Sequence, residues 1–285
     1  MKSSMPMRNL VRSQTAKRLK KLDDELRGIV LKPRSRRRKD ADAIHDLRVA
    51  IRRLSEELRV FEEWFKPGPV KRIRGSVRKL MERCAAVRNC DIAAEVLRTA
   101  GWTAPELFAG LQEERRHTRQ ELARTLESWR RRSRVRKWRR HLQAGHTDSK
   151  ESARENARRL LPAMMTDLFR AGREAARPDS SRQRMHRFRL EAKRLRYTLE
   201  LFDPLYGRKA KQIVESLKGL QEKLGAINDC ATTLEMIRRD RAAAAAVRRL
   251  VGEREAEFRA HWTKHFGPRE RMRWKAVLGA ADGKK

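Results

Sequence analysis

Two short segments of the chain repeat one arrangement of histidine and basic residues. The first reads HDLRVAIRRL from His45 to Leu54, and the second reads HRFRLEAKRL from His186 to Leu195. In each, arginine or lysine follows the histidine at intervals of three and four residues. Cations at this spacing can make successive charge-assisted hydrogen bonds, many of them bidentate, to the oxygens of a phosphate chain. Phosphate recognition explains these residue types better than other ligand chemistries.

Such rows need helices to position them. At about 100° per residue, the first basic row falls within roughly 60° on one side of a helix; its members are His45, Arg48, Arg52 and Arg59, with Arg53 set apart. The predicted core face opposite consists of Ile44, Leu47, Ile51, Leu54, Leu58 and Phe61. The second basic row consists of His186, Arg189 and Lys193, with Arg182 before it, Arg196 flanking it and Tyr197 beside His186. Its core face consists of Phe188, Ala192, Leu195, Leu199 and Phe202.

Another interpretation is that each row is a solvated helix face, which is typical of a single amphipathic helix. Two observations favour a binding site. The spacing occurs twice, and few glutamates interrupt the rows as i,i+4 partners would. For His45 and His186, a structural role and a ligand-contacting role both remain open.

The repeat extends beyond these segments and predicts a duplicated fold. Matched positions differ by 141 residues (186 − 45), and the same offset relates Ala16–Leu19 to Ala157–Leu160. We therefore predict an all-α domain over residues 8–266, built from half-repeats of about residues 8–144 and 150–266 around a pseudo-twofold axis, with the boundary near 145–150. A basic tail over residues 267–285 has few apolar residues to bury, so we expect it to be loose.

Apolar residues recur every three or four positions through most of the chain, and proline or glycine separates these stretches. In the first half this pattern predicts helices at Arg8–Leu31, Ala41–Lys66, Val70–Ala100 with a break around Ala85–Asn89, and Pro105–Gln143. In the second half it predicts helices at Ser152–Ala176, Arg182–Phe202, Lys209–Lys223, Ala226–Arg239 and Ala242–Phe266. The expected breaks include Pro33, Gly207 and Gly225.

Composition narrows the classes of partner. The chain carries 72 Lys and Arg against 37 Asp and Glu, a formal net charge of +35, which favours a polyanionic partner. Its 3 cysteines form no CxxC pair, so we expect neither a disulfide framework nor a zinc site, and a reducing cytoplasm fits best. No signal peptide and no membrane span are expected.

The repeated segments resemble the paired signatures of the CHAD family, an all-helical domain named for its histidines. The match extends to Val87–Ile92 after the first segment and to Leu224–Asp229 after the second, and covers about residues 8–266. Two positions depart from the family pattern: Arg88-Asn89 replaces the usual Arg-Asp, and Ser55 stands where the second repeat has Arg196.

The resemblance implies two helical bundles around a basic central cavity that binds inorganic polyphosphate without hydrolysing it and without a cofactor or metal. It places binding roles on His45, Arg48, Arg52, Arg53, His186, Arg189, Lys193, Arg194 and Arg196. It extends them to Arg12, Arg18, Arg59, Arg88, Arg158, Arg159 and Tyr197. Oligomeric state and association with polyphosphate or storage granules stay open.

Two other functions compete with this interpretation. The first is sequence-nonspecific nucleic-acid binding, since basic clusters also occur at Arg36–Lys39 and at Trp129–Arg140. The two tryptophans of the second cluster, Trp129 and Trp138, are more typical of core anchors beside a solvated arginine stripe. The second is an enzyme acting on polyphosphate, for which Asp46, Asp91 and Asp229 are the nearby carboxylates. We expect these to orient arginines or cap helices.

Overall fold

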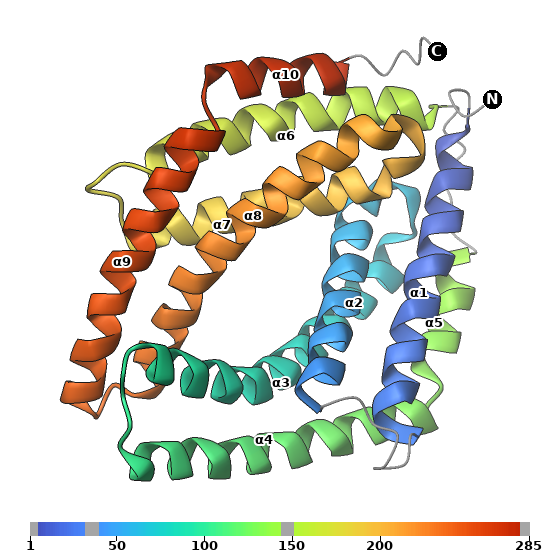
Figure 1. The fold of residues 1–285 in the computed structure, drawn as a ribbon. Helices are drawn as coiled ribbons and strands as arrows, with labels where there is room; N and C mark the ends of the chain where they lie inside the picture. The colour runs from blue at the N-terminus through green and yellow to red at the C-terminus, as the bar shows by residue number, and fades with distance from the viewer. Residues whose placement is uncertain (1–4, 32–39, 144–150, 280–285) are drawn as a thin grey trace. The chain divides into compact units, whose positions relative to one another are not determined.

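The computed structural model describes residues 5–31, 40–143 and 151–279 (Figure 1). Within these residues the regular elements are ten α-helices and one 3-10 helix, with no strand. The prediction of an all-α fold is confirmed. Predictions for Pro33, Arg36–Lys39, the boundary at 145–150 and residues 280–285 lie outside the described residues.

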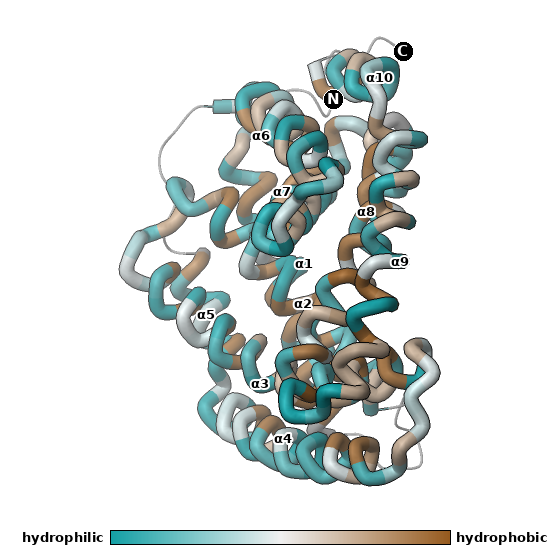
Figure 2. The backbone as a smooth tube through the Cα atoms, turned by 90° about the vertical axis from the view of Figure 1, so that its left-hand side faces the viewer, coloured by the Kyte–Doolittle hydropathy of each residue, from teal (hydrophilic) through white to brown (hydrophobic). Residues whose placement is uncertain are grey.

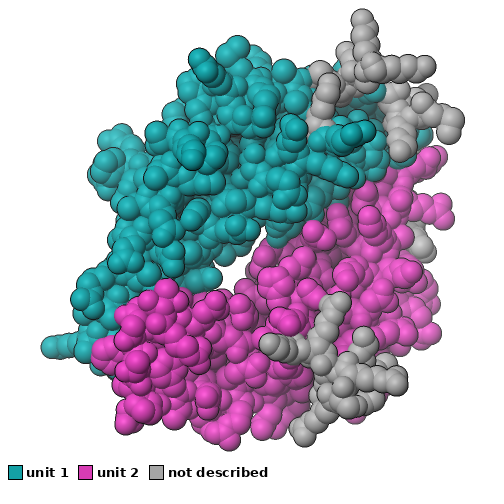
Figure 3. All heavy atoms as spheres, viewed as in Figure 1, with its two compact units in different colours: residues 1–7, 150–285 teal, residues 8–149 magenta. Residues whose placement is uncertain are grey.

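The chain folds into two compact units, coloured separately in Figure 3. The first unit, residues 8–149, contains α1 (Met7–Leu31) except for its first residue. It also contains α2 (Asp40–Val60), η2 (Glu62–Trp64), α3 (Pro67–Thr99), α4 (Pro105–Arg131) and α5 (Arg134–Gln143). The second, residues 1–7 and 150–285, contains α6 (Ala153–Ala175), α7 (Arg182–Leu201), α8 (Asp203–Met236), α9 (Arg241–His265) and α10 (Pro268–Gly279).

In the 8–149 unit, α3 packs against both α2 and α4. It begins at Pro67, three residues before the predicted start, because proline suits the first turn of a helix. The break predicted around Ala85–Asn89 is wrong, since α3 is continuous to Thr99. Cys84, Val87 and Cys90 are buried at three-residue spacing in this stretch, so packing favours an unbroken helix.

The single helix predicted over Pro105–Gln143 is two helices. α4 ends at Arg131 and α5 begins at Arg134, with Ser133 between them in the left-handed region at φ 47°. No proline or glycine marks this turn in the sequence. Along α4, apolar and polar residues alternate in the hydropathy colouring of Figure 2, as expected of an amphipathic helix.

In the 150–285 unit, α7 packs between α6 and α8, and α9 packs on α8. Capping residues define the starts of three helices: Ser152 forms a capping box with Glu155 before α6, and Ser181 and Asp240 cap α7 and α9. The predicted break at Gly207 is confirmed as a kink at the start of α8, where φ is 59°. The break predicted at Gly225 is wrong, because α8 continues to Met236 through contacts with α7 and α9.

The expectation of a loose segment after Phe266 is wrong for residues 268–279, which form α10. Trp274 and Leu278, one turn apart, are fully buried, and α10 packs on α6 and α8. The Trp274 ring meets the ring of Phe169 edge-on at 5.4 Å. Nearby, a Cβ on Gly172 would lie 2.0 Å from the Trp262 ring, so α6 and α9 need glycine at this contact.

Candidate functional site

α2 presents its apolar and basic residues on different faces, as predicted. Each residue of the predicted core face is fully buried: Ile44, Leu47, Ile51, Leu54, Leu58 and Phe61. The row on the other side has an exposed histidine followed by half-buried arginines: His45, Arg48, Arg52, Arg53 and Arg59. Packing of the apolar face therefore fixes the direction in which the basic row points.

α7 repeats this division. Its core face is buried at Phe188, Ala192, Leu195, Leu199 and Phe202. His186 is exposed, and the basic residues that follow are half-buried: Arg189, Lys193, Arg194 and Arg196. The helix carries seven Lys or Arg against two Glu, so it is a strongly cationic element.

The environment of His45 shows that cations converge on the α2 row. Although its side chain stays accessible to solvent, its pKa is lowered from the ordinary 6.5, first by partial burial of the ring and next by the positive charge of Arg88 on α3. Arg52 and Arg48 lower the pKa further, whereas Asp46 opposes them. Burial disfavours the cationic imidazolium, and the neighbouring arginine charges disfavour it further while they would attract an anion.

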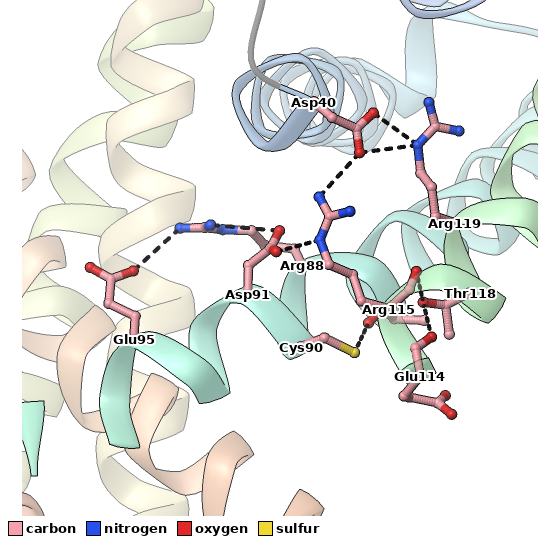
Figure 4. Close-up of polar contacts among 10 residues, drawn as sticks. Asp40, Arg88, Cys90, Asp91, Glu95, Glu114, Arg115, Thr118 and Arg119 are labelled. Atoms are coloured by element: carbon pink, nitrogen blue, oxygen red, sulfur yellow. Dashed lines mark hydrogen bonds and ion pairs between the residues drawn. The ribbon is translucent and has the colours of Figure 1, made fainter. Parts of the chain in front are cut away.

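Arg88 is held between two carboxylates of its own helix (Figure 4). Its guanidinium lies 3.9 Å from Asp91 and 4.0 Å from Glu95. Asp91 also accepts a hydrogen bond of 2.5 Å from Nε of Arg115 on α4. The expectation that Asp91 orients arginines is therefore confirmed.

A further carboxylate, Asp40 at the start of α2, joins this network. It accepts hydrogen bonds from Arg115 at 3.1 Å and from Arg119 at 2.8 Å, so α4 is tied to both α2 and α3 (Figure 4). Sequence reasoning missed Asp40, Arg115 and Arg119 because they are far apart in the chain. One feature of the sequence could have identified Asp40: it lies in the first turn of α2, a position that favours negative charge.

In the other unit, His186 lines a pocket of about 640 Å³ between α7 and α8. Nδ1 of His186 lies 3.2 Å from Oδ1 of Asn228, within hydrogen-bonding distance. The polar lining includes Arg182, His186, Arg189, Asn228, Thr232 and Glu235. Asn228 was not predicted as a site residue, although it belongs to the second turn signature.

Several predicted site residues instead face carboxylates. Short-range pairs form between Arg59 and Glu56, between Arg194 and Glu191 at 2.7 Å, and between Arg196 and Glu200 at 3.6 Å. Arg159 lies 3.5 Å from Glu151, and the largely buried Arg18 lies 3.7 Å from Glu57. Glutamates therefore lie beside more of the predicted site residues than we expected.

The remaining predicted residues differ in accessibility. Arg12 and Arg158 are exposed on α1 and α6. Tyr197 is only 3% exposed, and the Arg196 guanidinium lies 4.5 Å above its ring centre. Tyr197 therefore supports Arg196 from within the core.

Other kinds of site find little support in the described residues. No group of three or more His, Cys, Asp or Glu side chains there could hold a metal ion. All three cysteines of the chain are free thiols and buried. None of the described helices is both long and apolar enough to cross a membrane.

Comparison with known proteins agrees with this architecture. The CHAD domain family matches residues 13–238. The crystal structure of the CHAD domain from the plant Ricinus communis is similar with a TM-score of 0.70 and 21% identity, over 98% of this chain and 94% of that one. PptA from Streptomyces chartreusis is similar with a TM-score of 0.60 and 17% identity, over 95% of this chain and 99% of that one. No curated protein matches the sequence.

The structural similarities extend over nearly the whole chain and establish the fold. The family match includes both histidine segments and the turn signatures that follow them. The chain belongs to the CHAD domain family.

Proposed function

We propose that this protein binds inorganic polyphosphate, without hydrolysing it, through the basic rows on α2 and α7. The observation that carries the proposal is the row of half-buried arginines beside His45, whose pKa is lowered first by burial and next by the positive charges of Arg88, Arg52 and Arg48. Burial alone would penalise a charge of either sign, but the positive charges of these arginines favour an anion beside His45. On α7, Arg182, His186 and Arg189 border one pocket and supply the same residue types.

The ligand chemistry follows from the spacing of these cations. Residues three and four apart lie on one helix face, about 5–6 Å from each other, so several can contact consecutive phosphoryl groups. Affinity then grows with the number of charge-assisted contacts, and binding weakens as salt rises because counterions are released. The internal duplication and the central cavity implied by the CHAD resemblance stay predictions.

The absence of hydrolysis is part of the proposal. Asp91 is engaged by Arg115 and lies near Arg88, and this arrangement neutralises arginines rather than leaving a carboxylate to hold a metal. A cytoplasmic location is also proposed, on the basis of the free thiols.

The proposal is tested by titrating the protein with polyphosphates of defined length. We expect Arg48→Ala with Arg52→Ala, and Arg189→Ala with Lys193→Ala, each to weaken binding at least tenfold, because one charge-assisted contact contributes about 1.5–3 kcal/mol. The matched control is Arg248→Ala with Arg249→Ala, which removes two exposed arginines of α9. Melting temperature is measured for every variant.

Three results would contradict the proposal. The control pair could weaken binding as much as the row pairs, or the row pairs could lower stability and affinity in parallel. Duplex DNA could also displace long-chain polyphosphate at matched phosphate concentration. If the protein shortened polyphosphate in the presence of a divalent metal, and Asp91→Asn abolished this shortening, the protein would be an enzyme instead.

A further inference from the structure

A second concentration of positive charge lies at the turn between α4 and α5, on helices other than those carrying the histidine rows. We call residues 129–141 the α4–α5 elbow. Its sequence, WRRRSRVRKWRRH, contains eight Lys or Arg and no carboxylate. Like charges at this density are costly for an isolated protein, so the elbow needs an anionic partner or a dense counterion layer.

The elbow is built on a rigid apolar base. The rings of Trp129 and Trp138 meet edge-on with centres 5.1 Å apart, and both residues are less than 10% exposed. The Arg134 guanidinium lies 5.5 Å from the Trp129 ring centre, a cation–π contact. Ser133 keeps a left-handed φ of 47°, a conformation that persists in a non-glycine residue only when its surroundings hold it. The backbone that carries the charges is therefore fixed before any ligand arrives.

Within residues 134–142 of α5, every exposed side chain is basic. Val135, Trp138 and Leu142 turn inward and are buried, whereas Arg136, Lys137, Arg139 and Arg140 are exposed. Within the described ranges, no ion pair joins these four cations to a carboxylate. Two acidic residues near the elbow are already engaged: Glu127 pairs with Arg130 at 2.6 Å, and Asp23 pairs with Arg27 at 2.9 Å.

Two hollows flank this face. One of about 350 Å³ is bordered by Arg27, Arg130, Arg134, Arg136 and Arg139, together with Asp23. The other, of about 290 Å³, is bordered by Arg72, Arg132, Arg134, Lys137 and His141. Arg134 lines both, so the positive charge is continuous from one hollow to the next.

The chemistry of the partner follows from what this surface offers and lacks. Because both tryptophans are buried, neither indole ring is available to stack on unpaired bases. The apolar residues of α5 are also buried, whereas helices that insert into a membrane surface expose theirs. Guanidinium and ammonium groups on a fixed convex helix suit the phosphates of a duplex backbone.

We propose that the α4–α5 elbow binds the phosphate backbone of duplex nucleic acid, independently of sequence and separately from the polyphosphate rows. The four exposed cations lie within residues 136–140 of α5 and rise about 6 Å along its axis, or roughly two base-pair steps, so their long side chains can reach neighbouring phosphates along one side of a groove. This inference does not rest on the polyphosphate proposal. A chain with both activities would connect polyphosphate to nucleic acid.

The test replaces the four exposed cations of α5 by glutamine: R136Q, K137Q, R139Q and R140Q together. A matched control removes the same charge from exposed arginines of α9 and α10: R241Q, R248Q, R249Q and R269Q. Binding of a labelled 24-base-pair DNA duplex is measured by fluorescence anisotropy from about 50 to 200 mM salt, the range over which such contacts weaken most. Affinities for long-chain polyphosphate and for vesicles rich in phosphatidylserine are measured in parallel.

We expect the α5 variant to lose at least tenfold in duplex affinity and to lower the slope of log affinity against log salt by up to about 4, since each lost phosphate contact contributes roughly 0.9. The control should lose less than threefold, and polyphosphate affinity should stay within threefold for both. Equal losses of duplex binding in the two variants would overturn the assignment. The assignment would also be overturned if the α5 variant lost as much affinity for polyphosphate as for the duplex. The same holds if the variant lost affinity for the vesicles alone.

Discussion

Glu57 provides a quantitative test of how the core of the 8–149 unit is held. Its side chain is completely buried, and Oε1 accepts a hydrogen bond of 2.6 Å from the Thr15 hydroxyl on α1. Burial raises the pKa of Glu57 to about 8, although Thr15 and Arg18 both act to lower it. The 3.7 Å contact with Arg18 by itself would indicate an ionised pair, but loss of hydration outweighs that attraction at this depth.

The pH dependence follows from this shift. In the unfolded chain Glu57 loses its proton near the ordinary pKa of 4.5, whereas in the folded chain it keeps the proton up to about pH 8. The unfolded state therefore binds fewer protons in this window, and the contribution of Glu57 to stability falls as pH rises from 4.5 to 8. At about 1.36 kcal/mol per pH unit the upper bound is roughly 5 kcal/mol, and relaxation of the buried site reduces this to about 2–3 kcal/mol.

The assay compares Glu57→Gln with the wild type by urea denaturation between pH 5 and pH 9. Glutamine can still accept the hydrogen bond from Thr15, but it cannot ionise. We expect similar stability at pH 5, an advantage for the variant that grows to about 2–3 kcal/mol near pH 8, and no further gain above. Glu82→Gln, at a side chain that is 66% exposed, is the control and should show no such trend. A variant that becomes steadily less stable than the wild type as pH rises would refute the reasoning and identify the Arg18 ion pair as dominant.

Two further predictions concern the α2 row. Asp91→Asn removes the carboxylate shared by Arg115 and Arg88. We therefore expect the free energy of unfolding to fall by about 1–3 kcal/mol and the affinity for polyphosphate to rise slightly. Weaker binding in a calorimetric titration would contradict this prediction. Bound polyphosphate should raise the lowered pKa of His45, so binding should take up protons and tighten as pH falls from neutral. Titrations in buffers of different ionisation enthalpy should show less proton uptake for His45→Gln than for the wild type, and equal uptake in both would count against the assignment.

Local patterns in the sequence predict the helix faces well. Leu47 and Leu54 on α2, and Phe188 and Leu195 on α7, are buried because the periodicity of an amphipathic helix is a property of neighbouring residues. The same periodicity placed His45 and His186 on exposed positions.

Features decided by tertiary packing could not be predicted in this way. Gly225 resembles a helix breaker, yet contacts on both sides of α8 keep it helical. Ser133 makes the turn between α4 and α5 with no local signal, because the packing of Trp129 against Trp138 determines where α5 starts. Such tertiary contacts exceed the small differences in intrinsic helix propensity.

The partners of the cations also come from the fold. Arg18 belongs to a repeated basic segment, but only the structure shows its side chain against Glu57 in the core. Arg88 belongs to a turn signature, but its field at His45 arises because α3 packs beside α2. Residue type and spacing therefore predicted the chemistry of the rows better than the geometry of individual members.

The docking of α10 has a practical consequence for preparing the protein. Ending a recombinant chain at Phe266, the natural choice from the repeat, would strip the cover from the rings of Phe169 and Phe266, which both contact Trp274. A shortened chain would then display an aromatic surface prone to self-association. Expression designs should therefore retain the chain through Leu278, whose side chain is also fully buried.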